Sequence, residues 1–377
     1  MKEFIISEKE YGQRLDKYLF KVLDRAPGGF IYKMLRKKNI VLNDRKASGR
    51  EIIQEKDHIK IYLSDETFAK FASVFPGDSD RQRTDTDEKT AKRTNGSSPY
   101  TDLNPQIPDS DSRSKLEIVY EDRDILVINK PAGLLSQKAS QGDDSANDRI
   151  ISYLFSSGQL TKEELRTFHP SICNRLDRNT SGLLIAGKTM RGLQQMGEQL
   201  KDRSAKKYYQ ALVRGRVAEP CHLHGYLVKD HRTNRVEILP DASFADRTQI
   251  SSFVDDCAKM SISDNSKILS SRPGSRIETA YRPAAYFGNA TLLEVHLITG
   301  RSHQIRAHLA SVGHPVLGDA KYGDSSVNRE LYRATGIRSQ LLHAWRMELA
   351  DGRILEAPVP DTFRKAEQWL CRSGLPA

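Results

Sequence analysis

The residues best suited to chemistry lie in one polar turn, NRLDRNTSG, at positions 174–182. The single carboxylate of this turn, Asp177, stands between Arg175 and Arg178, and neighbouring positive charge favours the ionised form of a carboxylate. The apolar run GLLIAGKT then predicts a buried strand, which places Asp177 at a sheet edge that a ligand can approach. An ionised carboxylate can act as a covalent nucleophile on an electrophilic sugar or base carbon. The alternative is an aspartate–arginine pair that only braces the turn, and this stretch alone favours that simpler interpretation.

Two later stretches add residues suited to RNA. KKYYQALVRG predicts a strand that carries Tyr209 beside Lys207, and an aromatic ring among cations can stack on a splayed-out base while the cations bind phosphates. RSHQIRAHLASVG predicts a helix with Arg301 at its start and Arg306 within it. A helical arginine can form a bidentate pair with a carboxylate. A core tyrosine and a surface arginine are the simpler alternatives for Tyr209 and Arg306.

Several other chemistries find no support in the sequence. The phosphate-binding loop of NTPases and the glycine motif of dinucleotide enzymes are both missing. His303 and His308 have the wrong spacing for a two-histidine metal face. Cys221, His222 and His224 in CHLH could supply three metal ligands, but no fourth ligand of suitable spacing lies near, so we predict no metal site. The four cysteines are widely scattered, which favours free thiols over disulfides.

The charge balance is basic. The chain has 377 residues, with 59 Lys+Arg against 49 Asp+Glu and a net charge of +10. Such an excess suits a phosphate-rich partner, because each neutralised phosphate releases counterions. No apolar run approaches the ~18 residues that span a bilayer, and the N-terminus lacks a secretory leader. We therefore expect a cytoplasmic protein without a membrane segment.

The composition divides the chain into three segments. Residues 1–63 predict a compact α/β unit, with helices over QRLDKYLFKVL and GGFIYKMLRKKN and strands over IVLNDRKA and DHIKIYL. Residues 64–114 are rich in Asp, Ser, Thr, Pro and Gly and predict a flexible polar linker. Residues 115–377 mix strands and helices without regular alternation, which favours an α+β fold with a mixed, largely antiparallel sheet. A polar insertion is predicted at about 240–276.

Five motifs resemble those of one family. HPSICNRLDRNTSGLLIAGKT is similar to the signature of the RluA-type pseudouridine synthases, whose usual form is close to HRLDRDTSGLLLLAKT. The other four follow in the family's order: YEDRDILVINKPAGLLS, KKYYQALVRG, LLEVHLITGRSHQIRAHLASVGHPVLGDAKYG, and LLHAWRMEL with EAPVPDTF. The resemblance implies the pseudouridine synthase fold and an Asp177 nucleophile. It also implies that Arg306 pairs with Asp177, that Tyr209 stacks on the base and that no cofactor is needed.

The N-terminal segment resembles a second known module. Its helices and strands are similar to the alpha-L RNA-binding domain shared with ribosomal small-subunit protein S-four. Nine cations are therefore candidates for RNA contacts. Those expected on the N-terminal module are Arg14, Lys33, Arg36, Lys37 and Lys38, and those expected near Asp177 are Arg175, Arg178, Lys207 and Arg301.

These observations predict a monomeric pseudouridine synthase that modifies structured RNA, with large-subunit ribosomal RNA as the expected substrate. The signature departs from its usual form at Asn174, where the family has histidine, so any role of that histidine in orienting RNA is open. One rival is a non-catalytic RNA-binding protein of ribosome assembly on the same scaffold. The other is a metal-dependent nuclease, which needs clustered carboxylates where these motifs supply arginines.

Overall fold

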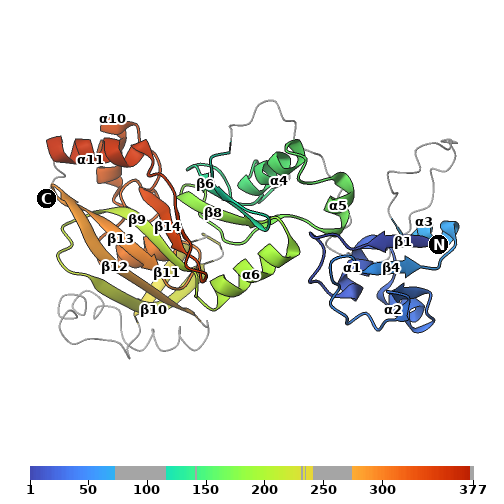
Figure 1. Ribbon diagram of the computed structural model, residues 1–377. Coiled ribbons are helices and arrows are strands. Elements are labelled where there is room, and N and C mark those ends of the chain that lie inside the picture. Colours follow the sequence, from blue (N-terminus) through green and yellow to red (C-terminus); the bar gives the residue numbers. More distant parts are fainter. Residues whose placement is uncertain (73–115, 141, 231, 234, 241–273, 374–377) are drawn as a thin grey trace. The chain divides into compact units, whose positions relative to one another are not determined.

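The computed structural model describes residues 1–72, 116–140, 142–230, 232–233, 235–240 and 274–373 (Figure 1). The chain divides into two compact units. The first unit contains residues 1–115, 148–171 and 187–193, and the second contains residues 116–147, 172–186 and 194–377. The ranges of these two units differ from the domain boundaries predicted at residues 63 and 115. The predicted division into domains stays a prediction.

The N-terminal part of the first unit has the helices and strands that its sequence predicts. Helices α1 (Leu15–Val22) and α2 (Gly28–Arg36) pack on a four-stranded antiparallel sheet. The strand order is β1 (Lys2–Ile5), β4 (His58–Ile61), β2 (Ile40–Leu42) and β3 (Arg45–Lys46). Asn43 and Asp44 both have positive φ, which is the backbone of a tight hairpin between β2 and β3. The apolar stripes of both helices are buried against β2 and β4.

The beginning of the predicted linker is helical, which corrects the composition-based expectation. Helix α3 covers Asp65–Phe71, and Ser64 caps it by accepting a hydrogen bond from the Thr67 backbone N–H. Phe68 is buried in the same core as α1 and α2. Phe71 also packs against this core, with its ring 4.4 Å from that of Phe30, so apolar contacts hold the short helix although the surrounding composition is polar. Residues 73–114 of the predicted linker lie outside the described residues.

Helices α4 (Ala146–Ser156) and α5 (Lys162–Thr167) lie largely within the first unit. Thr161 and Glu164 form a capping box at the start of α5. Glu164 also accepts from Lys9 at 2.7 Å, and Lys21 donates to the Thr167 carbonyl at 2.8 Å. Side chains from the N-terminal segment thus bind a helix more than 140 residues later in the chain.

The second unit is built on an 11-stranded sheet. Its main path runs β11 (Arg235–Pro240), β10 (Cys221–Asp230), β12 (Ser275–Phe287), β13 (Ala290–Leu297), β9 (Lys206–Arg214), β14 (Leu342–Glu348), β8 (Ser181–Gly187), β6 (Ile125–Lys130) and β5 (Ile118–Glu121). Strands β15 (Ile354–Glu356) and β7 (Ser171–Ile172) pair beside it. Strand β14 is parallel to β8 and antiparallel to β9, so the sheet is mixed and largely antiparallel, as predicted. Of the predicted 240–276 insertion, residues 241–273 lie outside the described residues, and its last two residues belong to β12.

Helices hold the sheet in shape. Helix α6 (Met190–Lys201) buries Met196 among residues of β6 and β8. Helix α9 (Gln304–Ser311) packs Ala307 on Leu227 and Ile277. Helices α10 (Ser325–Thr335) and α11 (Asp361–Ser373) lie side by side and cover residues of β9 and β13 (Figure 1). No helix in the described part of the chain is long and apolar enough to cross a membrane.

Candidate active site

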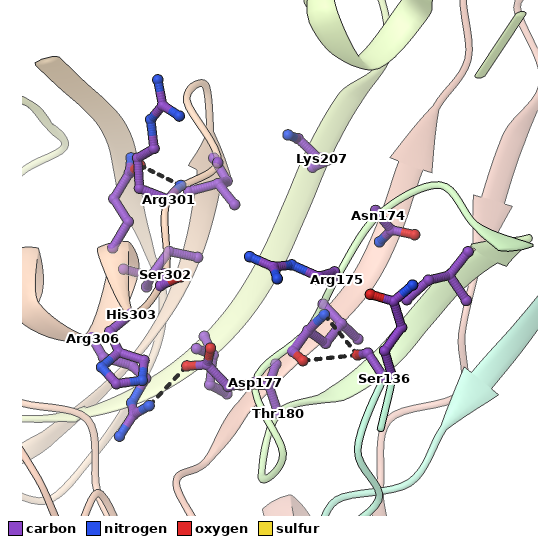
Figure 2. A pocket seen from close by; sticks show the side chains of 18 of the residues that line it. Ser136, Asn174, Arg175, Asp177, Thr180, Lys207, Arg301, Ser302, His303 and Arg306 are labelled. Atoms are coloured by element: carbon purple, nitrogen blue, oxygen red, sulfur yellow. Dashed lines mark hydrogen bonds and ion pairs between the residues drawn. The ribbon is translucent and has the colours of Figure 1, made fainter. Parts of the chain in front are cut away.

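The polar turn at 174–182 and helix α9 meet at one ion pair. Arg306 Nη1 donates to Asp177 Oδ2 at 2.7 Å, across 129 residues of sequence (Figure 2). The other edge of the guanidinium faces Asp319, where Nε donates to Oδ2 at 2.6 Å and Nη2 donates to Oδ1 at 2.8 Å. Arg306 is therefore held in a bidentate pair by one carboxylate while it presents its remaining nitrogen to the other.

Burial strengthens this arrangement. Asp319 is fully buried, the Arg306 side chain is 9% exposed, and the Asp177 side chain is 24% exposed. Burial alone would lower the pKa of Arg306, but the ion pairs with Asp319 and Asp177 outweigh it and raise that pKa. Burial would likewise raise the pKa of Asp319, yet the hydrogen bonds and charge of Arg306 lower it. Both groups of the inner pair thus stay charged, and the guanidinium is a permanent cation beside Asp177.

The start of α9 has an unusual backbone. His303 precedes the helix at φ 58°, in the left-handed region that a residue with a Cβ rarely adopts. Its Nδ1 is 3.0 Å from the Tyr322 hydroxyl, and the Arg306 guanidinium lies over the Tyr322 ring at 5.3 Å. Gln304, which is buried, donates to the Glu278 carbonyl at 3.0 Å and so anchors the helix on β12. These contacts fix the direction in which Arg306 leaves the helix.

The loop that carries Asp177 is held from below by Lys130. This lysine is fully buried at the end of β6, and its Nζ donates to the carbonyls of Pro131, Leu134 and Arg178 at 2.9, 2.8 and 3.1 Å. Burial lowers the pKa of Lys130 to about 7. Its three carbonyl partners join the NKPAG segment to the turn after Asp177, so the position of the carboxylate depends on a residue far from it in sequence.

Glycine is required immediately after the turn. Gly182 has φ 113°, and a Cβ there would lie 2.2 Å from the carbonyl oxygen of Ala344 on β14. That close approach lets β8 run parallel to β14, with His343 aligned to Ser181 and Ala344 to Gly182. Gly182 therefore allows the loop that carries Asp177 to continue into β8 alongside β14.

Asp177 lies on the wall of a cavity of about 820 Å³. The lining comes from residues 135–139, the turn at 172–180, β9 and the start of α9 (Figure 2). Tyr209 belongs to this lining and is 6% exposed. Burial is the larger cause that raises the pKa of its phenol, and the negative charge of Asp177 is the smaller one. The cavity is of the size that binds small molecules and nucleosides.

Three of the four cations predicted near Asp177 line the cavity. Arg175 and Arg301 are exposed, and Lys207 is half-buried with a pKa lowered by burial. Figure 2 shows Arg175 reaching from the turn into the space between Asp177 and Lys207. Arg178 is exposed but does not line the cavity. The five cations predicted on the N-terminal module belong to the first unit, and all of them are exposed: Arg14, Lys33, Arg36, Lys37 and Lys38.

The sequence of this site matches a known family. A model of the RNA pseudouridylate synthase family matches residues 124–311, which contain Asp177, Tyr209 and Arg306. The chain belongs to this family. Full-length relatives agree: the ribosomal large subunit pseudouridine synthase C of Pasteurella multocida (strain Pm70) is 27% identical over 354 residues, covering 92% of this chain and 85% of that protein.

Two further similarities are narrower. The ribosomal large subunit pseudouridine synthase D of Nitrosomonas europaea is 31% identical over 254 residues, which cover 65% of this chain and 62% of that protein. Among solved structures, human RNA Pseudouridylate Synthase Domain Containing 4 is 20% identical, with a TM-score of 0.49, and the match covers 67% of this chain and 92% of that one.

In this pseudouridine synthase, Asn174 has a structural task. Its side-chain amide donates to the Leu183 carbonyl at 3.1 Å and its carbonyl accepts from the Ile185 N–H at 2.8 Å. The turn is thereby tied to β8, and Asn174 also lines the cavity. The residue that replaces the family's usual histidine therefore holds the backbone on which Asp177 stands.

The residues that orient Arg306 and the loop carrying Asp177 were missed by sequence reasoning. Asp319 and Tyr322 lie in GDAKYG, His303 lies directly before α9, and Lys130 lies in NKPAG. All four are inside motifs that carry the family resemblance. A charged or polar residue within an otherwise apolar or glycine-rich motif was the signal that could have marked each of these four residues. The spacing in the sequence does not predict which residue each of them contacts.

Proposed function

We propose that this pseudouridine synthase converts specific uridines of large-subunit ribosomal RNA to pseudouridine, with Asp177 as the covalent nucleophile. The observation that carries the proposal is the ion pair between Asp177 and the buried Arg306 at the wall of an 820 Å³ cavity lined by further cations. The substrate class follows from the related proteins, which are named as large-subunit ribosomal RNA enzymes. We further propose that the protein acts as a cytoplasmic monomer without a cofactor.

The target uridine leaves its stack and enters the cavity, as bases do in enzymes that act on them within folded nucleic acids. Asp177 then attacks either C1′ of the ribose or C6 of the base. Both routes break the N1–C1′ bond, rotate the base and form a C5–C1′ bond. In the first route C5 displaces Asp177 from C1′, and in the second Asp177 is eliminated from C6, so the free carboxylate is regenerated. The proton on C5 is lost and N1 gains one, so the atoms balance and no electrons are transferred to another molecule.

Arg306 acts on the nucleophile rather than on the leaving base in this proposal. Its Nη1 occupies Asp177 Oδ2, and Oδ1 is the oxygen that attacks. Because Asp319 holds the guanidinium on its other edge, the charge beside Asp177 does not need to reorganise during the reaction. A cation fixed by a second carboxylate is thereby held in place beside Asp177.

RNA binding is divided between the two units. Tyr209 is proposed to stack on the flipped base, and Arg175, Lys207 and Arg301 to bind phosphates around the cavity. The exposed cations of the N-terminal alpha-L-like module are proposed to hold more distant phosphates. Arg14 donates to Asp16 at 2.6 Å, so the exposed cations at the end of α2 are the stronger candidates for phosphate contacts on this module.

The decisive experiment is pseudouridine mapping of total RNA from a strain that lacks the gene. The strain is complemented with wild type, Asp177→Asn or Asp177→Ala, each at a level matched by immunoblot. We expect one or more large-subunit sites to lose pseudouridine in the deletion, to regain it with wild type, and to stay unmodified with either variant.

Two outcomes would overturn the proposal. If no site disappears in the deletion, the protein is not a pseudouridine synthase of that RNA. If Asp177→Asn restores the lost sites or the ribosome profile, the non-catalytic assembly protein is the better description. Conversion of purified ribosomal RNA by wild type in excess EDTA, with the RNA intact, excludes the metal-dependent nuclease.

A further inference from the structure

A second group of reactive side chains lies on the sheet outside the cavity. His222 and His224 alternate with Leu223 on β10, so strand geometry directs both imidazoles to one face. Glu278 on β12 stands directly opposite His224 in the register. The neighbouring residue Ile277 faces the other way and packs against α9. The two histidines and Glu278 therefore share the face that is turned away from α9 and Arg306.

The side chains of this group converge. One potential ligand atom from each of His222, His224 and Glu278 lies within 4.8 Å of the others. His222 Nε2 is 2.9 Å from Glu278 Oε1, and the two imidazole rings are 4.2 Å apart between centroids. Ligands of a tetrahedral metal with bonds of about 2.0–2.1 Å are about 3.3 Å apart, so only a small rotation of the exposed His222 side chain is needed. Within the described part of the chain, no other group of three His, Cys, Asp or Glu side chains converges in this way.

We propose that His222, His224 and Glu278 form a binding site for a divalent transition-metal ion, with Zn²⁺ as the metal that fits the two-histidine, one-carboxylate set. Three protein ligands leave a fourth position for water or a further ligand. Imidazole nitrogens select Zn²⁺, Cu²⁺ and Ni²⁺ over Mg²⁺ and Ca²⁺, which prefer oxygen. The ion would bridge β10 and β12 from the side and stiffen their pairing.

A simple ion pair does not account for the whole arrangement. His58 and Glu3 in the N-terminal module form such a pair at 3.0 Å, and no third ligand converges on them in the described structure. Around Glu278 a second imidazole, that of His224, lies against the first, and a simple ion pair between His222 and Glu278 has no use for it. Arg203 Nη1 approaches Glu278 Oε2 at 3.9 Å, which orients the carboxylate while Oε1 faces His222. An oriented ligand of this kind is typical of the shell around a metal site.

The half-exposed position gives an ion access from solvent, since the His222 side chain is 47% exposed. Of the three possible ligands that CHLH offers in the sequence, the Cys221 side chain alternates to the opposite face of β10 and cannot join the two histidines. The sheet register supplies Glu278 instead. Catalysis by Asp177 does not depend on this inference.

The test is Zn²⁺ binding by tag-free protein that has been stripped with EDTA and returned to chelator-free buffer at pH 7.5. We expect isothermal titration to give one Zn²⁺ per chain with a micromolar or lower dissociation constant. His224→Ala and Glu278→Gln should each weaken binding by at least about tenfold. Co²⁺ as a substitute probe should give the intense visible absorption of a low-coordinate site in wild type and not in His224→Ala.

The matched control is His58→Ala, which removes a histidine from a His–Glu pair without a second imidazole and should leave Zn²⁺ binding unchanged. Circular dichroism confirms that each variant is folded, and the exposed His222→Ala provides an independent loss of one ligand if either inner variant fails to fold. Zn²⁺ binding that is absent, that is weaker than millimolar, or that persists unchanged in His222→Ala and His224→Ala would overturn the proposal. Binding lost in those variants and kept in His58→Ala supports it.

Discussion

Asp319→Asn tests whether the inner carboxylate orients the arginine of the site. The substitution keeps the size of a fully buried side chain. An asparagine oxygen at the Oδ1 position can still accept from Arg306 Nη2 and from the backbone of Lys321 and Tyr322, which are 2.8, 2.8 and 3.1 Å away. The amide nitrogen then replaces Oδ2 and faces Arg306 Nε, 2.6 Å away in wild type. Two donors oppose each other there, and the charge that balances the guanidinium is lost.

The expected cost follows from burial. Removing one partner of a buried ion pair costs roughly 3–5 kcal/mol of unfolding free energy. Three of the four hydrogen bonds to the Asp319 carboxylate survive in asparagine, and Arg306 keeps Asp177, so we expect the lower end, about 3 kcal/mol. Because the guanidinium is no longer fixed beside Asp177, we expect kcat to fall by about 10- to 100-fold, which corresponds to about 1.4–2.8 kcal/mol of activation free energy.

The assay must separate positioning from stability. Urea unfolding measures the free energy of unfolding, and single-turnover pseudouridine formation with saturating enzyme in excess over RNA measures the chemical step at a temperature where the variant is folded. RNA affinity is measured by filter binding. We expect the rate constant to fall and the dissociation constant for RNA to change less than about threefold, because residue 319 is buried beneath Arg306 and does not face the cavity.

Asp324→Asn is the matched control. Asp324 pairs with Arg214 at 2.6 Å on a partly exposed surface and caps α10, and asparagine is also a good cap. We expect less than about 1 kcal/mol of destabilisation and an unchanged rate. A rate within about twofold of wild type in folded Asp319→Asn would refute the argument that the inner pair positions Arg306.

The remaining predictions concern binding, the site and pH. Arg306→Lys should lower kcat by about 100-fold and leave RNA affinity unchanged, because an ammonium cannot hold two carboxylates in the same planar geometry. Single-turnover kinetics measures the rate, and filter binding measures the RNA affinity. Arg175→Ala should weaken RNA binding and reduce the slope of log affinity against log salt by about one, whereas Arg178→Ala should change both less because it lies outside the cavity. Burial lowers the pKa of His343 to about 4, so between about 6.5 and 4 the unfolded chain binds more protons than the folded one and stability falls as pH is lowered. Roughly 3 kcal/mol should be lost over that window, and His343→Asn should flatten the profile in urea unfolding at a series of pH values; an equally steep profile in the variant would contradict this.

Local pattern was enough for several helices and strands, whereas the proposed role of Asp177 as nucleophile came from the resemblance to a family. The apolar stripes of α1 and α2 and the strand after Asp177 follow from residue spacing, because each depends on neighbours within a few turns or residues. The linker beginning at 64 was misjudged for the same reason. A polar composition describes average burial, but Phe68 and Phe71 pack a short helix against the core of this unit.

The partners of the site were not available from spacing. The pair between Asp177 and Arg306 was expected only because the motifs resemble a family, and nothing in the chain between them predicts a 2.7 Å contact. Asp319 lies in the GDAKYG part of a motif that carries the resemblance. Its role in holding Arg306 follows only from the tertiary structure, in which the loop after α9 brings Asp319 against the guanidinium.

The same division holds on the opposite face of the sheet. The sequence shows only that His222 and His224 are two residues apart, and the structure places them on strand β10, where alternation directs both to one face. Only the pairing of β10 with β12 decided that Glu278 is the third member. Strand order and register depend on the packing of the whole core, since a shift of one residue would turn Glu278 to the buried face. The sequence by itself therefore determines residue types and local periodicity. Long-range packing of the strands and helices decides which side chains contact each functional group.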